Sequence, residues 1–399
     1  MLAASQLTDA IGNGAYITCS VLYFTRIVGL SPTQLGVGLT VSWGAGFLAG
    51  VPLGHLADRW GPRRTATALA IGTCLSVAAF LVVRSFPLFM LAACGYACCQ
   101  SGLASARQAL LAALVERTER TAVRAYLQAA TNAGLALGAA VGGLALHFNT
   151  ANGYLAILAM DAAGFAVSGC LLLRVPAVAA VPAATAGRML AVLSDRPYAL
   201  LTVLNTIMLL RMPIISLAIP LWIVERTHAA SWLVSAVLVL NTVAVMLWQV
   251  RVSRRVRDLG SAATLVRQSG VLLLLSCAVF ALSGANVPGW AAAVFLLLAA
   301  ALQVLGEMMQ SAGAWEISFE LAPADRQGQY QGFFGTGTAV ARMLGPVLLI
   351  TLIVGWGASG WLLLGGMFLV AGLLNGPAVR WAVRTRVDGS VDMSTRAVR

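Results

Sequence analysis

The chain contains no lysine, although it has 26 basic residues, all of them arginine. Without lysine there can be no GxxxxGK[ST] nucleotide loop and no Schiff-base lysine. The three histidines, His55, His147 and His228, are scattered and form no HExxH motif, and there is no GxSxG motif. The sequence therefore gives no support to a nucleotide-driven pump, a metal site or a nucleophilic enzyme. We expect a protein that is not an enzyme and that uses no cofactor and no metal.

Charged residues are also scarce. They make up 10% of the chain, while 59% of the residues are hydrophobic; an average soluble protein is about 25% charged. A soluble fold with so few charges could not cover its own surface. The seven cysteines form no CxxC pair and all lie within apolar segments. We interpret them as buried thiols that pack as small hydrophobic side chains.

Long apolar runs occupy almost the whole length. Twelve of them are long enough to cross ~30 Å of hydrocarbon as a helix, at residues 3–28, 33–56, 65–83, 86–114, 122–146, 152–174, 198–224, 230–250, 262–284, 288–320, 328–353 and 357–379. The sequence thus predicts an all-α membrane protein with twelve transmembrane helices in two pseudo-symmetric six-helix bundles. We expect an N-terminal bundle at 1–174, a cytoplasmic linker at 175–197, a C-terminal bundle at 198–380 and a cytoplasmic tail at 381–399.

The arginines are distributed unevenly between the two sides of these segments. With the N-terminus inside, 20 of the 26 fall in the inner turns, in the adjoining span ends or in the tail, three in or beside outer turns (Arg26, Arg84 and Arg226) and three deeper within spans. Cytoplasmic loops carry the excess of basic residues, so the pattern predicts that both termini are cytoplasmic. The same rule explains the net charge of +12 without a nucleic-acid partner. The many Ala, Gly and Arg residues suggest a GC-rich genome and hence a bacterial inner (plasma) membrane.

The two halves of the chain resemble each other. The segment "YLQAATNAGLALGAAVGG" at Tyr126–Gly143 aligns with "FFGTGTAVARMLGPVLLI" at Phe333–Ile350, and each follows a turn that contains an acid and an arginine. Repeats of this kind are the architecture of many secondary transporters, which bind substrate near the bilayer midplane between two rocking halves.

The most polar run in the first hundred residues is "GHLADRWGPRR", which joins the second and third apolar segments. Its glycines suit a tight turn, and Asp58 can accept hydrogen bonds from that turn or from the N-terminus of a neighbouring helix. With the twelve segments and the repeat, the run resembles the signature of the major facilitator superfamily between spans two and three. The resemblance implies a conformational latch, closed in the outward-facing state, formed by Gly54, Asp58, Arg59, Gly61, Arg63 and Arg64. The alternative is a capped turn that only sets the topology.

A second resemblance lies in the fifth segment, where Gly134, Gly138, Gly142 and Gly143 repeat at about four-residue spacing and would allow close helix packing. The run resembles the antiporter signature of the same family. However, Ala139 stands where that signature has proline, and the Gly-Pro pair lies in the eleventh segment instead. The fourth segment also lacks the family's arginine near its outer end. These departures weaken the implication of export.

Apart from charged residues near the span ends, seven ionisable residues are assigned to the interior of the predicted spans: Asp9, Arg107, Asp161, Arg211, Glu307, Glu316 and Arg342. Each costs about 2.5–3.5 kcal/mol on insertion, so such residues face a cavity or form ion pairs. Because four acids oppose three bases, one carboxylate lacks a fixed cation and is suited to carry a proton. Asp161 and Glu307, near the midplane, are the first candidates for proton coupling, followed by Asp9 and Glu316. Structural ion pairs are the alternative for each residue.

A substrate cavity needs a few polar groups among apolar and aromatic walls. Our candidates for substrate binding are Arg211, Arg342, Tyr16, Asn13, Trp43, Asn132, Asn205 and Gln310. Arg211 is also a candidate movable partner for one of the acids, and the sequence leaves open whether Arg211 or Arg342 neutralises an acid. For each aromatic residue the alternative is packing within the bundle.

These patterns predict a secondary active transporter, a monomer in the lipid bilayer, that exports small organic or drug-like compounds by alternating access with proton coupling. A second hypothesis is an uptake symporter or facilitator for a small hydrophilic metabolite. A third is a transporter-like sensor or membrane enzyme.

Overall fold

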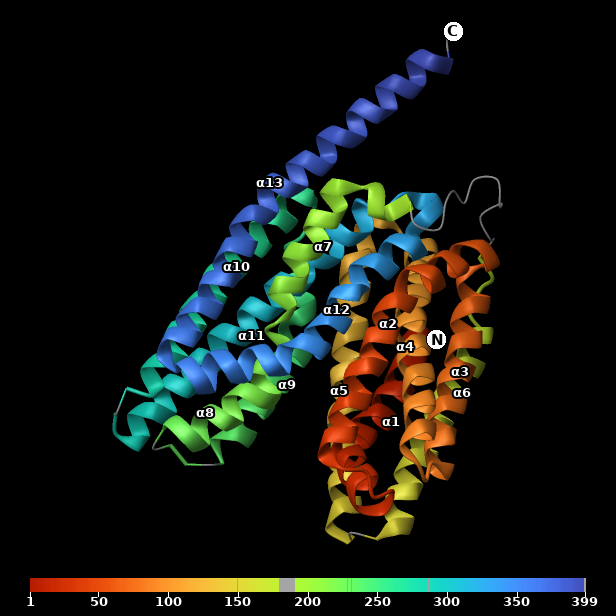
Figure 1. The fold of residues 1–399 in the computed structure, drawn as a ribbon. Helices are drawn as coiled ribbons and strands as arrows, with labels where there is room; N and C mark the ends of the chain where they lie inside the picture. The colour runs from red at the N-terminus through yellow and green to blue at the C-terminus, as the bar shows by residue number, and fades with distance from the viewer. Residues whose placement is uncertain (149, 179–190, 228, 231, 286, 398–399) are drawn as a thin grey trace. The chain divides into compact units, whose positions relative to one another are not determined.

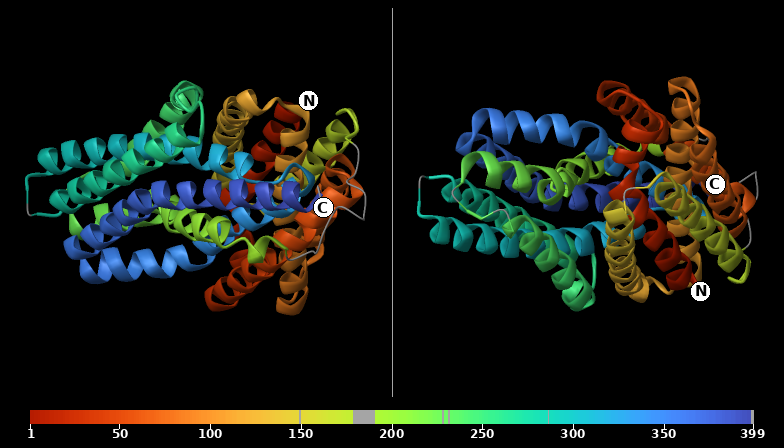
Figure 2. Two further views of the ribbon diagram at one scale, coloured as in Figure 1. Left: turned by 90° about the horizontal axis from the view of Figure 1, so that it is seen from above. Right: turned by 90° about the horizontal axis from the view of Figure 1, so that it is seen from below.

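The computed structural model describes residues 1–148, 150–178, 191–227, 229–230, 232–285 and 287–397. Within these ranges every regular element is a helix (Figure 1). Figure 2 shows the same helices in two further views. In chain order the elements are α1 (Leu2–Leu22), η1 (Tyr23–Ile27), α2 (Pro32–Trp60), α3 (Pro62–Val82), α4 (Phe86–Leu114), η2 (Arg117–Glu119), α5 (Arg120–Phe148), α6 (Ala151–Leu173), η3 (Ala191–Ser194), α7 (Arg196–Leu209), η4 (Ile214–Ala218), α8 (Ile219–Arg226), α9 (Leu233–Ser253), α10 (Leu259–Ser283), α11 (Gly289–Glu320), η5 (Ala324–Arg326), α12 (Gln327–Leu349), η6 (Ile350–Gly355) and α13 (Ala358–Ala397).

The predicted all-α membrane architecture is confirmed. Eleven helical segments in the described part of the chain are long and apolar enough to cross a membrane. They coincide with the second to the twelfth predicted segments. The first predicted segment forms α1 and η1, and its polar residues Gln6, Thr8 and Asp9 make it less apolar than the others.

Two segments differ from the regular helices expected from hydropathy. The seventh is broken: α7 ends at Leu209, a turn follows, and the chain continues through the π-helical η4 into α8. Pro213 and Pro220 lie at this break, where each removes a backbone N–H from the helical ladder. The last segment does not end near residue 380, because α13 continues to Ala397 through the stretch predicted as a tail.

Several helix starts are fixed by side-chain caps. Ser31 forms a capping box with Gln34 at the start of α2, and Thr150 and Asp195 cap α6 and α7. Asp258 caps α10 by accepting a hydrogen bond of 2.7 Å from the backbone N–H of Ser261. This hydrogen bond holds the pKa of the Asp258 carboxyl below its usual value. A cap of this type stabilises a helix by about 0.5–2 kcal/mol.

The described helices group into two compact units. The first consists of Met1–Met189, Val245–Val250 and Ala324–Met343, and the second of Leu190–Ala244, Arg251–Pro323 and Leu344–Arg399. The first unit therefore contains α1 to α6 together with most of α12. The predicted linker at 175–197 falls largely on residues 179–190, which lie outside the described residues, so the division at 174 and 198 stays a prediction.

The first unit is held together by close helix contacts and an aromatic cluster. Helix α5 packs against α1 through Gly134, Gly138 and Gly142: a Cβ atom on Gly138 would lie 1.9 Å from the carbonyl oxygen of Ile11. Gly143 has open space instead. The cluster contains Tyr16, Phe24, Phe80 and Phe89 and lies at one end of α1, α3 and α4.

Candidate functional site

The polar run between the second and third spans forms a tight turn between α2 and α3. Gly61 occupies the position between the two helices with φ of 92°, a conformation that favours glycine. Asp58 lies on the last turn of α2 and is 7% exposed. Its two carboxylate oxygens accept hydrogen bonds from the backbone N–H groups of Gly328 at 2.6 Å and Gln329 at 2.8 Å. Of the two arrangements expected for Asp58, the observed one is thus a bond to the N-terminus of another helix, α12.

Glycines permit this approach of α2 to α12. A Cβ atom on Gly54 would lie 2.1 Å from the carbonyl oxygen of Gly328, and one on Gly328 would lie 2.3 Å from the carbonyl oxygen of Gly54. One turn further along, Gly332 approaches Gly50 in the same way, at 2.3 Å. The backbones of α2 and α12 therefore touch without intervening side chains, and this brings the Asp58 carboxylate to the start of α12.

The arginines of the same run have other surroundings. Arg63 donates hydrogen bonds to the carbonyl oxygens of Val175 at 2.9 Å and Leu173 at 3.4 Å, just after α6. A cation at the C-terminal end of a helix is stabilised by the helix dipole. Arg59 and Arg64 are exposed. The six predicted latch residues thus divide into those at α12 (Gly54 and Asp58), the turn glycine Gly61, Arg63 at the end of α6, and two exposed arginines.

The sequence repeat is visible in the local structure. A short 3-10 turn, η2, precedes α5, and a second one, η5, precedes α12 at the equivalent position of the repeat. The segment "RVSRRVRDLGS" at Arg251–Ser261, a degraded counterpart of the polar run in the second half, has a different arrangement. Asp258 is exposed and caps α10, the helix that directly follows it. Asp58, in contrast, lies on α2 and caps a different helix, α12.

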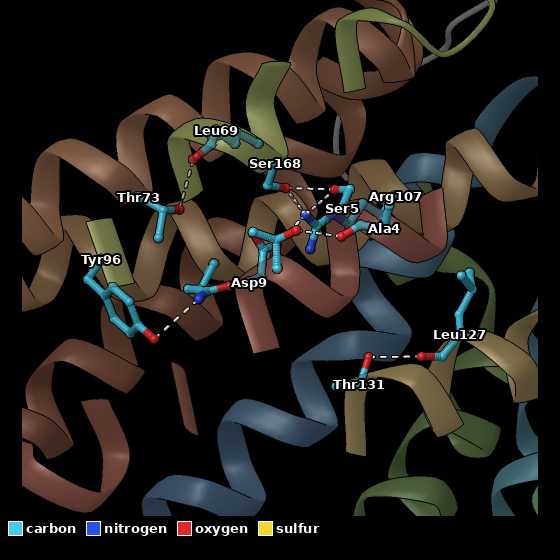
Figure 3. A network of polar contacts seen from close by, with 12 residues as sticks. Ala4, Ser5, Asp9, Leu69, Thr73, Tyr96, Arg107, Leu127, Thr131 and Ser168 are labelled. Atoms are coloured by element: carbon cyan, nitrogen blue, oxygen red, sulfur yellow. Dashed lines mark hydrogen bonds and ion pairs between the residues drawn. The ribbon is translucent and has the colours of Figure 1, made fainter. Parts of the chain in front are cut away.

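Asp9 and Arg107 form an ion pair between α1 and α4 (Figure 3). The same guanidinium nitrogen donates hydrogen bonds to the hydroxyls of Ser5 at 3.0 Å and Ser168 at 2.7 Å. Ser5 and Ser168 are themselves 2.6 Å apart. Asp9 therefore carries a neutralised charge within a polar network of α1, α4 and α6. Sequence reasoning missed the two serines, although Ser5 lies one helical turn before Asp9.

Asp161, on α6, is the most isolated of the predicted acids. It is fully buried, and neither of its carboxyl oxygens has a hydrogen-bond partner among the described residues. The residue lies against α1, where a Cβ atom on Gly12 would be 2.5 Å from Asp161 Oδ1. The carboxyl group thus lies against α1 at a position where only a glycine leaves room for it.

Glu307, on α11, lies in a second polar network. Its Oε1 is 2.9 Å from Nη1 of Arg211, and its Oε2 accepts a hydrogen bond of 3.1 Å from the side chain of Asn241. Arg211 lies in the break after α7 and is 5% exposed. Of the two arginines left open by the sequence, Arg211 is the one that neutralises an acid. Glu316 is half-buried near the C-terminal end of the same helix.

Arg211 has further partners. It donates to Oε1 of Gln310 at 2.8 Å and 3.2 Å and to the hydroxyl of Ser311 at 2.9 Å. Gln310 in turn donates to Asn205 at 2.8 Å. The network thus brings together three predicted substrate-binding residues, Arg211, Gln310 and Asn205, but their polar groups form hydrogen bonds with one another. Ser311 was missed by sequence reasoning; its polar side chain within an apolar span was the available signal.

The remaining candidates lie in the first unit. The hydroxyl of Tyr96 donates to Asn13 at 3.3 Å and accepts from Gln100 at 3.2 Å. Asn132 accepts a hydrogen bond of 3.1 Å from Gln128 one turn earlier on α5. Tyr16 is buried and stacks on Phe80, so the structure places it in the aromatic cluster.

Arg342 and Trp43 form a pair of their own. The guanidinium carbon of Arg342 lies 4.4 Å from the centroid of the Trp43 ring, in cation–π geometry. Arg342 lies on α12 and is exposed, while Trp43 on α2 is half-buried. No carboxylate is within ion-pair distance of Arg342 in the described part of the chain. The described residues also contain no cluster of His, Cys, Asp and Glu that could hold a metal ion.

The all-helical architecture, the repeat and the α2–α3 turn are accompanied by a match over most of the chain: the family model of the Major Facilitator Superfamily matches residues 2–346. The chain belongs to this family. Members of the superfamily are membrane transporters, so this chain is a multi-pass membrane transporter and not an enzyme. No curated protein sequence matches it.

Solved structures of superfamily transporters share the fold. A bacterial homologue of the iron transporter ferroportin in the outward-facing state has a TM-score of 0.75 at 17% identity, covering 96% of this chain and 98% of the other. The human organic anion transporter MFSD10 (TETRAN) has a TM-score of 0.71 at 16% identity, covering 94% and 97%. The proton:xylose symporter XylE has a TM-score of 0.70 at 14% identity, covering 93% of each chain. At these identities the likeness is one of fold.

Proposed function

We propose that this superfamily member exports small organic compounds from the cytoplasm by alternating access, driven by protons that enter in exchange. In this proposal the halves at 1–174 and 198–380 rock against each other in a bacterial inner membrane, with both termini cytoplasmic. The observation that carries proton coupling is the state of Asp161, which is fully buried with both carboxyl oxygens unpartnered among the described residues.

Two of the other candidate acids are less suited to carry the proton. Asp9 is neutralised by Arg107, and Glu307 is neutralised by Arg211. A carboxylate without donors or a cation is costly in its charged form in a low-dielectric site, whereas the protonated form is tolerated. Of these three acids, Asp161 is therefore the one whose protonation and deprotonation should change the free energy of a transporter conformation most. Glu307 becomes a second carrier if Arg211 moves away from it during the cycle.

Asp58 has a separate role in this proposal. Its two hydrogen bonds join the end of α2 to the start of α12, and Gly54 and Gly328 allow the helices to touch there. Charge-assisted hydrogen bonds to a helix N-terminus stabilise the conformation that contains them. We infer that this contact is the latch of one transport state and opens in the other.

An uptake symporter is the alternative. XylE and the fucose:proton symporter FucP, which share the fold, are both described as proton symporters. In a symporter the proton and the substrate cross in the same direction, and in an exporter of the proposed type they cross in opposite directions. The chemistry required of Asp161 is the same in both cases, so the direction has to come from a transport measurement.

The direction of transport and its coupling to protons can be tested with the purified protein in proteoliposomes under an imposed pH gradient. A panel of small organic acids, amides, amines and sugars is offered, and accumulation is measured with the gradient in each orientation and after its collapse by an ionophore. Accumulation on the acidic side identifies exchange with protons. Accumulation on the alkaline side identifies symport and would overturn the export proposal. Transport at a rate that does not depend on the pH gradient would contradict the proposed proton coupling.

A further inference from the structure

Arg342 is an intramembrane cation without a partner acid among the residues that the structure describes. The other two intramembrane arginines of the predicted spans, Arg107 and Arg211, each pair with a carboxylate. Arg342 instead lies over the ring of Trp43, and no carboxylate reaches it in the described ranges of the chain. Because an isolated charge within a span is costly, such a residue faces water or a ligand of opposite charge.

The face of α12 that carries Arg342 is consistent with an open cavity. Gly335, Thr338 and Arg342 follow one another at helical spacing, and Gly335 and Arg342 are both exposed. A Cβ atom on Gly335 would meet nothing within 4 Å, and one on Gly44, beside Trp43, would meet only the Met343 sulfur at 3.9 Å. A face turned to lipid would carry apolar side chains, whereas this one carries a glycine, a threonine and an arginine.

The surroundings of Arg342 suit a ligand with a flat body. Trp43 holds one face of the guanidinium at 4.4 Å, and this leaves the in-plane N–H groups for an acceptor. In the same unit, the hydroxyl of Tyr96 is hydrogen-bonded to the side chains of Asn13 and Gln100. An arginine fork of this kind matches the two oxygens of a carboxylate or of a phosphonate.

We propose that the substrate of this transporter is an organic anion, whose carboxylate or phosphonate is bound by Arg342 and whose flat apolar body packs beside Trp43. The inference rests on the proposed transport function and specifies its substrate class. Arg211 does not take this role, because its charge is paired with Glu307 and it also donates hydrogen bonds to Gln310 and Ser311.

The test uses the full-length protein in detergent and titration calorimetry with four probes of one shape: 2-naphthoate, 2-naphthylphosphonate, 2-naphthamide and 2-naphthylamine. We expect one or both anions to bind about tenfold or more tightly than the amide, because hydrogen bonds to charged groups are the stronger ones. The anion that binds more tightly identifies the group. Equal binding of the amide, tighter binding of the amine, or no binding of either anion would overturn the inference.

Three variants locate the effect. Arg342→Gln should remove the preference for the anion, and Arg342→Lys should keep part of it, because it retains the charge without the fork. Trp43→Phe should weaken all probes while leaving the preference. Arg384→Gln removes an exposed arginine of α13 and should change nothing. A preference that survives in Arg342→Gln contradicts the inference. Anion binding that is intact in a protein without proton-driven transport would refute the proposed function alone.

Discussion

The carboxylate of Asp58 accepts a hydrogen bond of 2.6 Å from the backbone N–H of Gly328, although the two residues are 270 positions apart. Its second oxygen accepts from Gln329, so one aspartate at the end of α2 serves as the cap of α12. Hydrogen bonds to a charged group contribute about 1.5–3 kcal/mol each, and they exist only while α2 and the start of α12 touch. A contact of this strength is sufficient to shift a conformational equilibrium by tenfold or more.

Replacing Asp58 by Asn tests this contact. The amide keeps one acceptor oxygen but turns an NH2 group toward the second backbone N–H, so we expect the start of α12 to separate from α2 more often. The amides of Gly328 and Gln329 should then exchange with deuterium about tenfold faster, and transport in proteoliposomes should fall while the protein remains folded.

The control for this variant is Asp325→Asn. Asp325 lies in η5, immediately before α12, but its side chain is 42% exposed and pairs with the neighbouring Arg326. This variant should leave both exchange and transport unchanged. Full transport activity together with unchanged exchange in Asp58→Asn would leave the α2–α3 turn with only a topological role.

A second prediction concerns the helix contact itself. In Gly54→Ala, the new Cβ atom would lie 2.1 Å from the carbonyl oxygen of Gly328, so the two backbones must move apart. Overpacking of this kind costs about 1–3 kcal/mol, and we expect faster exchange at the start of α12 and a lower melting temperature. Gly143→Ala is the matched control, since nothing lies within 4 Å of its Cβ position. Equal melting temperatures of the two variants would contradict the close contact.

The ion pair of Arg211 and Glu307 gives a third prediction. Arg211→Gln and Glu307→Gln each leave a charge without its partner. Breaking a fully buried pair costs about 3–5 kcal/mol, and we expect a smaller cost here because the Glu307 side chain is 26% exposed. The double variant removes both charges and should be destabilised by less than the sum of the single variants. A double-mutant cycle of unfolding free energies in mixed micelles should therefore give a coupling of about 0.5–3 kcal/mol. Additive effects would show that the pair does not contribute to the stability of the fold.

The sequence predicted the membrane spans well, because hydrocarbon thickness sets the length of an apolar run. The fourth segment, predicted at 86–114, is α4 with the same bounds. Hydropathy could not predict the π-helical turns η1, η4 and η6, since a change of hydrogen-bond register leaves the apolar pattern intact. Nor did it give the helical continuation of α13 beyond residue 380.

The pairing of charges was beyond the sequence for a different reason. Asp9 and Arg107 are 98 positions apart, and only the packing of α1 against its neighbours brings them together. The sequence alone showed that the acids assigned to the spans outnumber the arginines there by one. Which acid stays alone depends on helix rotation: Asp161 faces the backbone of α1 at Gly12, whereas Glu307 reaches Arg211.

The last prediction follows from that difference. In Asp161→Asn the amide has nearly the size and polarity of a protonated carboxyl group, so we expect the variant to fold and to bind substrate as the wild type does. It cannot release a proton, however, and the step that returns the empty carrier should no longer respond to pH. Substrate exchange at equal pH should continue, while accumulation driven by the gradient should be lost.

Two variants serve as controls for Asp161→Asn. Asp9→Asn breaks a pair with Arg107, and Glu307→Gln breaks a pair with Arg211, so both are expected to alter stability. If Asp161 alone carries the proton, both keep a response to the gradient at reduced protein stability. If the response to the gradient disappears in Glu307→Gln and persists in Asp161→Asn, Glu307, the partner of Arg211, is the group that carries the proton. Retention of wild-type accumulation in all three variants would mean that none of these acids couples transport to the gradient.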